Sequence, residues 1–299
     1  MIDGVINIYK EKGYTSSDVV AKLRGILRQK KIGHTGTLDP AAEGVLPVCL
    51  GKATKLCELL TEKTKEYRCV CRLGVQTDTE DMEGEILSIQ PADCSVEEIR
   101  EAALSFIGDY PQIPPMYSAI KQNGKRLYTL AREGITVERP PRNVRIEELE
   151  IENCGLSGNE KRFSFRVVCS RGTYIRSLCR DIGEKLGCGA AMEKLERTRS
   201  GIFTADQALK LDEVQKLFGE NSLNAHILPI EFFYKELGKL TVLPDALKLL
   251  DNGNTLKTDS FAEKNITGER FRIYDTDDRF RAVYARSDDT GLFKPEQMF

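Results

Sequence analysis

Residues 33–55 read GHTGTLDPAAEGVLPVCLGKATK, and this stretch decides how the rest of the chain is interpreted. Four glycines lie around Asp39, which is followed directly by Pro40. Glycine permits backbone conformations that other residues avoid, and proline holds the residue before it extended. We therefore expect Asp39 on a rigid, sharply turned loop, although Asp-Pro pairs also mark ordinary turns.

The residues on the C-terminal side of this loop predict two regular elements. The apolar run over residues 45–50 is short enough for a buried strand. After Gly51, a helical pattern places Leu56, Leu59 and Leu60 on one face.

Composition is that of an ordinary globular protein. The chain has 299 residues, of which 40% are hydrophobic and 30% charged, enough for one large or two modest domains. No apolar run approaches the roughly 20 residues that cross a bilayer. The N-terminus lacks the basic region and apolar core of a secretory signal. We expect a cytoplasmic protein without membrane contact.

The potential metal ligands are few. Nine cysteines include no Cys-x-x-Cys pair, and the histidines are only His34 and His226. Such cysteines are typical of reduced, mostly buried thiols in a cytosolic protein. We expect no bound metal.

The net charge of −2 does not by itself indicate a nucleic-acid partner, but the distribution of charge is uneven. Residues 22–31 hold five basic and no acidic residues, and residues 121–145 hold seven basic against two acidic. Residues 166–199 hold eight basic against four acidic, whereas residues 62–109 are mainly acidic. Basic islands in a near-neutral chain fit a protein that offers one face to phosphates. Any single island is more simply explained as a solvated helix face.

Hydrophobic periodicity predicts a mixture of helices and strands. Thr15 with Asp18, and Ser95 with Glu98, have the spacing of capping boxes at helix starts. The second helix is expected to run to Gly108. Strict alternation predicts a strand over residues 65–73, and further strands are expected over 144–151, 162–169 and short runs near the C-terminus. The acidic segment 77–84, TDTEDMEG, is expected to be a solvated turn.

Several motifs resemble those of one enzyme family in the same order. They are NIYKEKGYTSSDVV (7–20), GHTGTLDP (33–40), KEY (65–67), KRLYTLAREGITVERPPR (125–142), GTYIRS (172–177) and EKLERTRSG (193–201). Together they resemble the pseudouridine synthases of the bacterial tRNA pseudouridine-55 (TruB) type. Two positions depart from the family pattern: Glu11 replaces a proline at a turn, and Glu196 replaces an arginine that contacts phosphate in many members.

The resemblance implies an α+β fold. Residues 1–238 would form the catalytic domain, with a central, mostly antiparallel mixed sheet flanked by helices. A basic insertion at about 120–145, the thumb, would grip RNA. Residues 239–299 would form a small, β-rich, truncated PUA-like RNA-binding domain.

The implied reaction isomerises the uridine at position 55, in the T arm of tRNA, to pseudouridine by flipping the base out of the RNA. Asp39 would be the nucleophile, Arg176 would pair with Asp39, and Tyr67 would stack on the base and transfer a proton. Substrate-binding positions would be His34, Lys55, Tyr174 and Leu195. Phosphate-binding positions would be Lys30, Lys31, Lys125, Arg126 and Arg142. The reaction needs no metal or cofactor, and we expect a monomer.

Two alternatives remain open from the sequence. A related synthase could act on another RNA or follow a guide RNA, as relatives in archaea and eukaryotes do. A protein of this type could also bind and refold RNA without essential catalysis. The chemical path, by attack at C1′, attack at C6 or elimination through a glycal, is equally open.

Overall fold

The computed structural model describes residues 1–156, 161–287 and 289–299, and its centre is a ten-stranded sheet. The main path through this sheet runs β14-β1-β3-β12-β4-β11-β10-β7, with β2 paired to β3 and β13 to β12. Its strands are β1 (Gly4–Lys10), β2 (Ile32–His34), β3 (Glu43–Leu50), β4 (Lys65–Leu73), β7 (Gly108–Gln112), β10 (Arg142–Gly155), β11 (Arg162–Cys169), β12 (Ala190–Ser200), β13 (Phe203–Thr204) and β14 (Ile227–Leu228). Only the β12–β3 pair is parallel among the pairings of these strands, so the predicted mostly antiparallel mixed sheet is confirmed.

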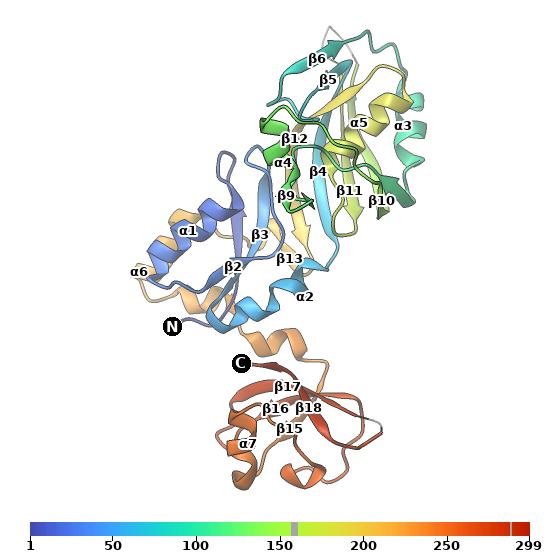
Figure 1. Ribbon diagram of the computed structural model, residues 1–299. Coiled ribbons are helices and arrows are strands. Elements are labelled where there is room, and N and C mark those ends of the chain that lie inside the picture. The colour runs from blue at the N-terminus through green and yellow to red at the C-terminus, as the bar shows by residue number, and fades with distance from the viewer. Residues whose placement is uncertain (157–160, 288) are drawn as a thin grey trace.

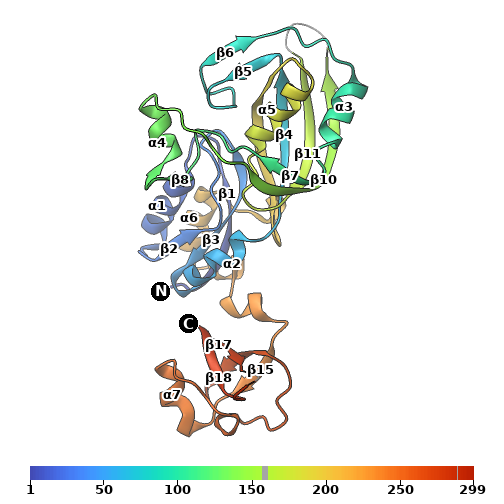
Figure 2. The same cartoon turned by 45° about the vertical axis from the view of Figure 1, so that its right-hand side comes forward.

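Helices cover the two halves of this sheet separately (Figures 1 and 2). Helices α1 (Ser16–Leu27) and α6 (Leu211–Gly219) pack on β1 and β3. Helices α3 (Val96–Leu104) and α5 (Ile175–Lys185) pack on β4, β11 and β10. The two apolar cores therefore meet where β3 lies beside β12.

Short elements connect these parts within residues 1–234. They are η1 (Gly51–Leu56), α2 (Cys57–Thr61), β5 (Val75–Thr77), β6 (Ile86–Ile89), β8 (Lys121–Gln122), β9 (Lys125–Arg126), α4 (Leu127–Arg132), η2 (Ala205–Gln207), η3 (Leu223–His226) and η4 (Ile230–Tyr234). The β8–β9 hairpin and α4 form the excursion that the sequence predicts as a thumb.

Local patterning explains several elements directly. Thr15 and Asp18 form the predicted capping box of α1, and the apolar stripe of this helix faces the core. Burial along β4 alternates through most of its length, because residues 67, 69, 71 and 73 face the α5 side of the sheet.

Other elements differ from the sequence prediction. Residues 51–56 form the 3₁₀ helix η1 and residues 57–61 form the short α2, in place of one continuous helix. Leu59 is exposed and does not lie on the buried face. Helix α3 ends at Leu104, and Ile107 is also exposed. The sequence pattern predicts no strand over residues 190–200, yet β12 occupies the middle of the sheet.

The C-terminal part forms a separate four-stranded sheet in the order β15-β16-β17-β18. Its elements are β15 (Gly238–Thr241), η5 (Pro244–Ala246), α7 (Leu247–Asp251), η6 (Thr258–Ser260), β16 (Arg270–Tyr274), β17 (Phe280–Arg286) and β18 (Phe293–Met298). This sheet has its own core, with Phe261, Phe271 and Phe293 at its centre. Its likeness to a PUA domain stays a prediction.

In the described ranges we find no helix that is both long enough and apolar enough to span a membrane.

Candidate active site

A cavity of about 1200 Å³ opens where the two halves of the large sheet meet. Its walls come from the loop after β2, the first residues of β4, the turn at residues 79–83, the thumb, the segment before α5, and β12. Of the predicted site residues, the cavity brings together His34, Asp39, Tyr67, Arg126, Tyr174, Arg176 and Leu195.

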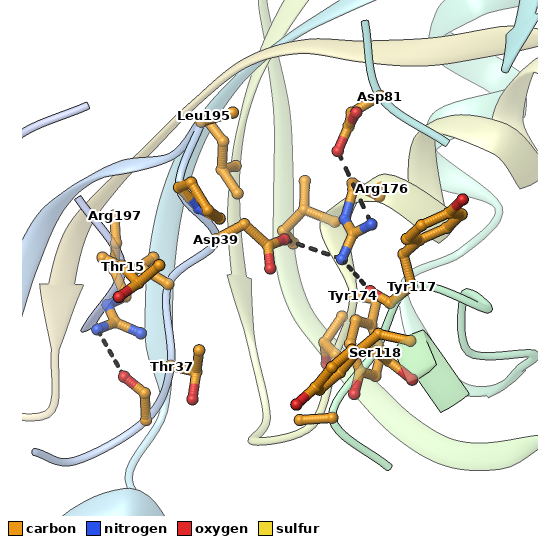
Figure 3. A pocket seen from close by; sticks show the side chains of 18 of the residues that line it. Thr15, Thr37, Asp39, Asp81, Tyr117, Ser118, Tyr174, Arg176, Leu195 and Arg197 are labelled. Carbon is orange, nitrogen blue, oxygen red and sulfur yellow. Dashed lines mark hydrogen bonds and ion pairs between the residues drawn. The ribbon is translucent and has the colours of Figure 1, made fainter. Parts of the chain in front are cut away.

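Asp39 lies on the loop between β2 and β3, and local contacts hold this loop in place. Leu38 N–H donates to Ser16 Oγ at 2.9 Å, and Ser16 Oγ donates to the Leu38 carbonyl at 3.2 Å, so the start of α1 fixes the loop. Gly36 has φ +92°, a conformation that favours glycine. The Asp39 side chain is 39% exposed and faces the cavity (Figure 3).

Arg176, in the first turn of α5, links Asp39 to two other segments. Its Nη2 lies 2.9 Å from Asp39 Oδ2 and donates to the Tyr117 carbonyl at 2.9 Å. Its Nη1 donates to the Thr79 carbonyl at 2.9 Å and lies 3.8 Å from Asp81 Oδ2. The guanidinium is buried, and charge-assisted bonds of this kind fix the orientation of a carboxylate.

The segment 77–84 corrects the sequence prediction of a solvated turn, because Thr77, Glu80 and Asp81 are buried. Glu80 accepts a hydrogen bond from Ser177 Oγ at 2.6 Å and another from Arg180. Asp81 accepts one from Thr79 Oγ1 at 2.6 Å. Burial raises the pKa of both carboxyl groups. Arg180 and Arg176 of α5 lie beside Glu80 and Asp81, and these cations offset the cost of burying the two carboxylates.

A signal for these buried acids was present in the sequence. Arg176 and Arg180 are four residues apart, so they lie on one face of the helix. Because buried charges are normally paired, two arginines on one face of a buried helix predict acidic residues on the segment that faces them.

Two tyrosines line the cavity from different elements. Tyr67 is on β4 and is 8% exposed, and burial raises the pKa of its phenol. Tyr174 precedes α5, and its backbone is held by the Gln112 amide through two bonds of 2.8 and 2.9 Å. Burial also raises the pKa of Tyr174. Both side chains are therefore neutral phenols near pH 7.

His34 and Leu195 complete the part of the cavity that the sequence predicts. His34 ends β2, and its Nδ1 is buried without a hydrogen-bond partner in the described part of the chain. Burial and the nearby Arg197 lower the pKa of His34, so its ring is neutral near pH 7. Leu195, on β12, is buried and contributes an apolar wall.

Five predicted residues do not line the cavity: Lys30, Lys31, Lys55, Lys125 and Arg142. Lys55 Nζ donates to the Met298 carbonyl, so it faces the C-terminal sheet instead. Lys125 Nζ lies 3.4 Å from Glu133 within the thumb. Glu196 accepts a hydrogen bond from the Tyr9 hydroxyl at 3.1 Å and also lies outside the cavity lining.

Many residues that line the cavity were not predicted as site residues, and Lys65, Asp81, Tyr117 and Arg197 are among them. Within the described ranges, no cluster of three or more His, Cys, Asp or Glu side chains has the arrangement of a metal site.

The comparisons with known proteins agree along the chain. Residues 24–175 match the N-terminal domain of the TruB family of pseudouridylate synthases. The chain belongs to this family. Residues 176–234 match the C-terminal domain of tRNA pseudouridylate synthase B.

Curated relatives cover the full length of the chain. The tRNA pseudouridine synthase B of Lachnoclostridium phytofermentans is 47% identical over an alignment of 308 positions, which covers 100% of each chain. That of Clostridium perfringens strain 13 is 46% identical, with 99% of each chain covered. That of Bacillus licheniformis is 41% identical over 100% of this chain and 98% of its own.

Solved structures of the same fold include the "Cbf5-Nop10-Gar1 Complex", with a TM-score of 0.70 and 28% identity over 99% of this chain and 84% of that one. A chain of the "H/ACA RNP bound to a substrate RNA containing 2'-deoxyuridine" has a TM-score of 0.68 and 26% identity, with 99% and 84% covered. The predicted pseudouridine-synthase fold of the family is thereby confirmed.

Proposed function

We propose that the chain is a tRNA pseudouridine synthase that isomerises the uridine at position 55 in the T arm. The observation that carries this proposal is the 2.9 Å ion pair between Asp39 and Arg176, inside a cavity that Tyr67 also lines. The names of the curated relatives support tRNA as the substrate.

The reaction breaks the N1–C1′ bond, rotates the uracil and joins C5 to C1′, after which C5 loses its proton and N1 gains one, so that the product is an isomer of uridine. Asp39 supplies the carboxylate nucleophile. Arg176 pairs with that carboxylate and aims it into the cavity, through a guanidinium that neighbouring carbonyls keep from rotating. The proposal does not depend on whether the carboxylate adds to C1′ or to C6 or assists elimination.

Tyr67 stacks on the uracil and passes on the C5 proton, a role that its position in the cavity lining supports. Because burial raises the pKa of Tyr67, its hydroxyl carries a proton near pH 7. A protonated hydroxyl takes part in proton transfer as a relay, accepting one proton while it gives up another. The neutral ring also stacks on a base without an added charge.

Access to the uridine requires the nucleotide to leave the RNA stack. The cavity volume of about 1200 Å³ is larger than one nucleotide needs, so part of the surrounding arm also enters. We propose that His34 fills the gap left in the stack, since a neutral aromatic ring offsets part of the lost stacking energy.

The thumb and the rim of the cavity supply cations for phosphates. Lys121, Arg126 and Arg132 reach the cavity from the thumb, and Lys12 and Arg171 reach it from other loops. Phosphate contacts of this kind position a nucleic acid without reading its sequence. We propose that Lys30, Lys31, Lys125 and Arg142 meet RNA farther from the reacting base.

A guide-directed synthase is the second candidate, because solved relatives come from H/ACA ribonucleoproteins. The basic thumb favours a stand-alone enzyme that grips its own substrate. Turnover of a bare tRNA transcript, without guide RNA or added proteins, separates the two. We further propose that the enzyme acts as a monomer in the cytoplasm, where its proposed substrate is found.

The deciding experiment measures tritium release from tRNA labelled at uracil C5. We expect wild type to release tritium. We expect Asp39→Asn to release tritium at less than about a thousandth of the wild-type rate and to bind tRNA with a similar Kd. Glu83→Gln is the matched control, because Glu83 also lines the cavity but is exposed and pairs with Lys12. Full activity of Asp39→Asn would exclude Asp39 as the nucleophile, and no release by folded wild type would exclude the function.

Asp39→Asn also tests the RNA-folding alternative. If this variant corrects the growth defect of a strain that lacks the gene, RNA binding rather than turnover is the essential activity.

A further inference from the structure

A buried arginine closes the loop that carries Asp39 from the side opposite Arg176 (Figure 3). Arg197, on β12, is 1% exposed. Its Nε donates to the Val45 carbonyl at 2.6 Å, and its Nη2 donates to the Gly36 carbonyl at 3.2 Å. The Gly36 carbonyl lies near the start of the loop and the Val45 carbonyl lies in β3, just after the loop ends, so one guanidinium bridges the two flanks of the loop.

The backbone of Arg197 joins the same loop to Tyr67. On one side, residue 197 is paired with Tyr67 of β4, and on the other side with Gly44 of β3. Gly44 has φ +109°, and a Cβ there would come within 2.2 Å of the Arg197 carbonyl oxygen. The strands therefore approach closely at this position, and only glycine permits the approach.

The guanidinium of Arg197 has no acidic partner in the part of the chain that the structure describes. Within residues 1–156, 161–287 and 289–299, no carboxylate lies within 4.0 Å of it. Burying a cation without a counter-ion costs free energy of folding. The presence of such a cation beside a cavity therefore indicates a role that an apolar side chain could not fill. Its charge reaches the site, since it opposes the rise in the pKa of Tyr67 that burial causes and helps to lower the pKa of His34.

We infer that Arg197 is a positioning residue that holds the Asp39 loop and the Tyr67 side chain at a fixed separation, an inference that rests on the proposed function. Arg176 orients the Asp39 carboxylate from the cavity side, and Arg197 holds the backbone that carries it. A displacement of about 1 Å in a reacting group lowers a rate by about 100-fold. Loss of this clamp should therefore slow the chemical step and leave RNA binding unchanged.

The test compares two substitutions with a control on the same strand. Arg197→Gln removes the charge and one of the two contacts, and Arg197→Lys keeps the charge but offers a single nitrogen for two carbonyls. Arg199→Gln is the control, because Arg199 is partly exposed and its Nη2 lies 3.6 Å from Glu66. Full-length proteins are assayed for single-turnover tritium release, tRNA Kd and the midpoint of urea unfolding.

We expect the single-turnover rate constant to fall about 100-fold in Arg197→Gln and at least about 10-fold in Arg197→Lys, with Kd within about threefold of wild type. Arg199→Gln should stay within about threefold on both measures. A folded Arg197→Lys with the wild-type rate overturns the inference. So does a failure of both Arg197 variants to fold, because Arg197 would then be a core residue only.

The wild-type control separates this inference from the function on which it depends. If wild type and Arg199→Gln turn over tRNA while the Arg197 variants match them, only the positioning role is overturned. If wild type releases no label from intact tRNA, the proposed function and the positioning role both fall.

Discussion

At the scale of single residues, the site places two cations around one exposed carboxylate. Arg176 contacts the Asp39 carboxylate directly. Arg197 instead contacts two backbone carbonyls, of Gly36 and Val45, which flank Asp39 in the sequence. A planar guanidinium suits both tasks because its donors are fixed relative to one another. Lysine offers a single ammonium on a flexible chain, so we do not regard Arg-to-Lys substitution as conservative at either position.

Lys65 makes a prediction about pH. Burial lowers the pKa of Lys65 to about 8, from an ordinary value of 10.5. Between these two values the unfolded chain binds the extra proton, so the contribution of Lys65 to the free energy of unfolding rises with pH. We expect the stability of wild type relative to Lys65→Met to increase by about 1–2 kcal/mol between pH 7.5 and pH 9.5.

Urea unfolding at the two pH values measures this change, with thiols kept reduced. Lys63→Met is the matched control, since Lys63 is an exposed neighbour, and its stability relative to wild type should not depend on pH. An unchanged difference between wild type and Lys65→Met would show that Lys65 stays charged in the folded protein.

At the scale of elements, β12 connects the two halves of the catalytic region. It pairs with β3 on one side and with β4 on the other, and it carries both Leu195 and Arg197 into the cavity. Its parallel pairing with β3 is short, from Glu196 to Arg197. The geometry of the cavity therefore depends on a small number of backbone contacts.

Gly44 tests this contact. A methyl group at position 44 would meet the backbone of Arg197 at 2.2 Å, and φ +109° is unfavourable for alanine. We expect Gly44→Ala to lower the free energy of unfolding by about 2–4 kcal/mol in urea titrations. Gly25→Ala is the control, because nothing lies within 4 Å of an added Cβ on α1, and it should stabilise by up to about 1 kcal/mol. Equal stability of the two variants would mean that β3 and β12 can separate without cost.

At the scale of the whole molecule, the C-terminal sheet packs against the underside of the catalytic region. Gln297 Nε2 donates to the Lys55 carbonyl at 2.7 Å and its Oε1 accepts from the Tyr234 hydroxyl at 2.8 Å. Val283 belongs to the same apolar cluster as Val5 and Val45. Val45 also receives the hydrogen bond from Arg197, so this apolar cluster reaches the strand that follows the active-site loop.

Lys55 is the residue for which the sequence and the structure differ at this scale. The sequence predicts contact with RNA, whereas the structure shows Lys55 in contact with Met298. We expect Lys55→Ala to keep KM for tRNA and kcat within about threefold of wild type and to speed proteolysis of the C-terminal sheet. Lys52→Ala is the control, since Lys52 is exposed on the same turn. A rise in KM of tenfold or more, with unchanged proteolysis, would favour the RNA contact.

Prediction from the sequence succeeded where the cause is local. The capping box of α1 and the alternation along β4 involve residues two to four positions apart, and both elements appear as expected. The family followed from short motifs in a fixed order, and full-length relatives confirm it. The site roles of Asp39, Tyr67 and Arg176 stay predictions, although the structure brings these side chains to one cavity.

Prediction failed where distant segments supply the partner. The acids of segment 77–84 looked solvated because the arginines that meet them lie about 100 residues later, on α5. The charged residues of β12 did not suggest a strand, since its two neighbours on the main path of the sheet, β3 and β4, come from the first quarter of the chain.

The amino-acid sequence by itself determined the family, the α+β class, and the loop of glycines and proline that presents Asp39. These depend on neighbouring residues and short motifs. Only the tertiary structure decided that Asp81 is buried beside Arg176, that Arg197 spans the Asp39 loop, and that Lys55 faces the C-terminal sheet. The physical reason is that the position of a charged side chain depends on which partner the fold brings to it, and these partners lie far away along the chain.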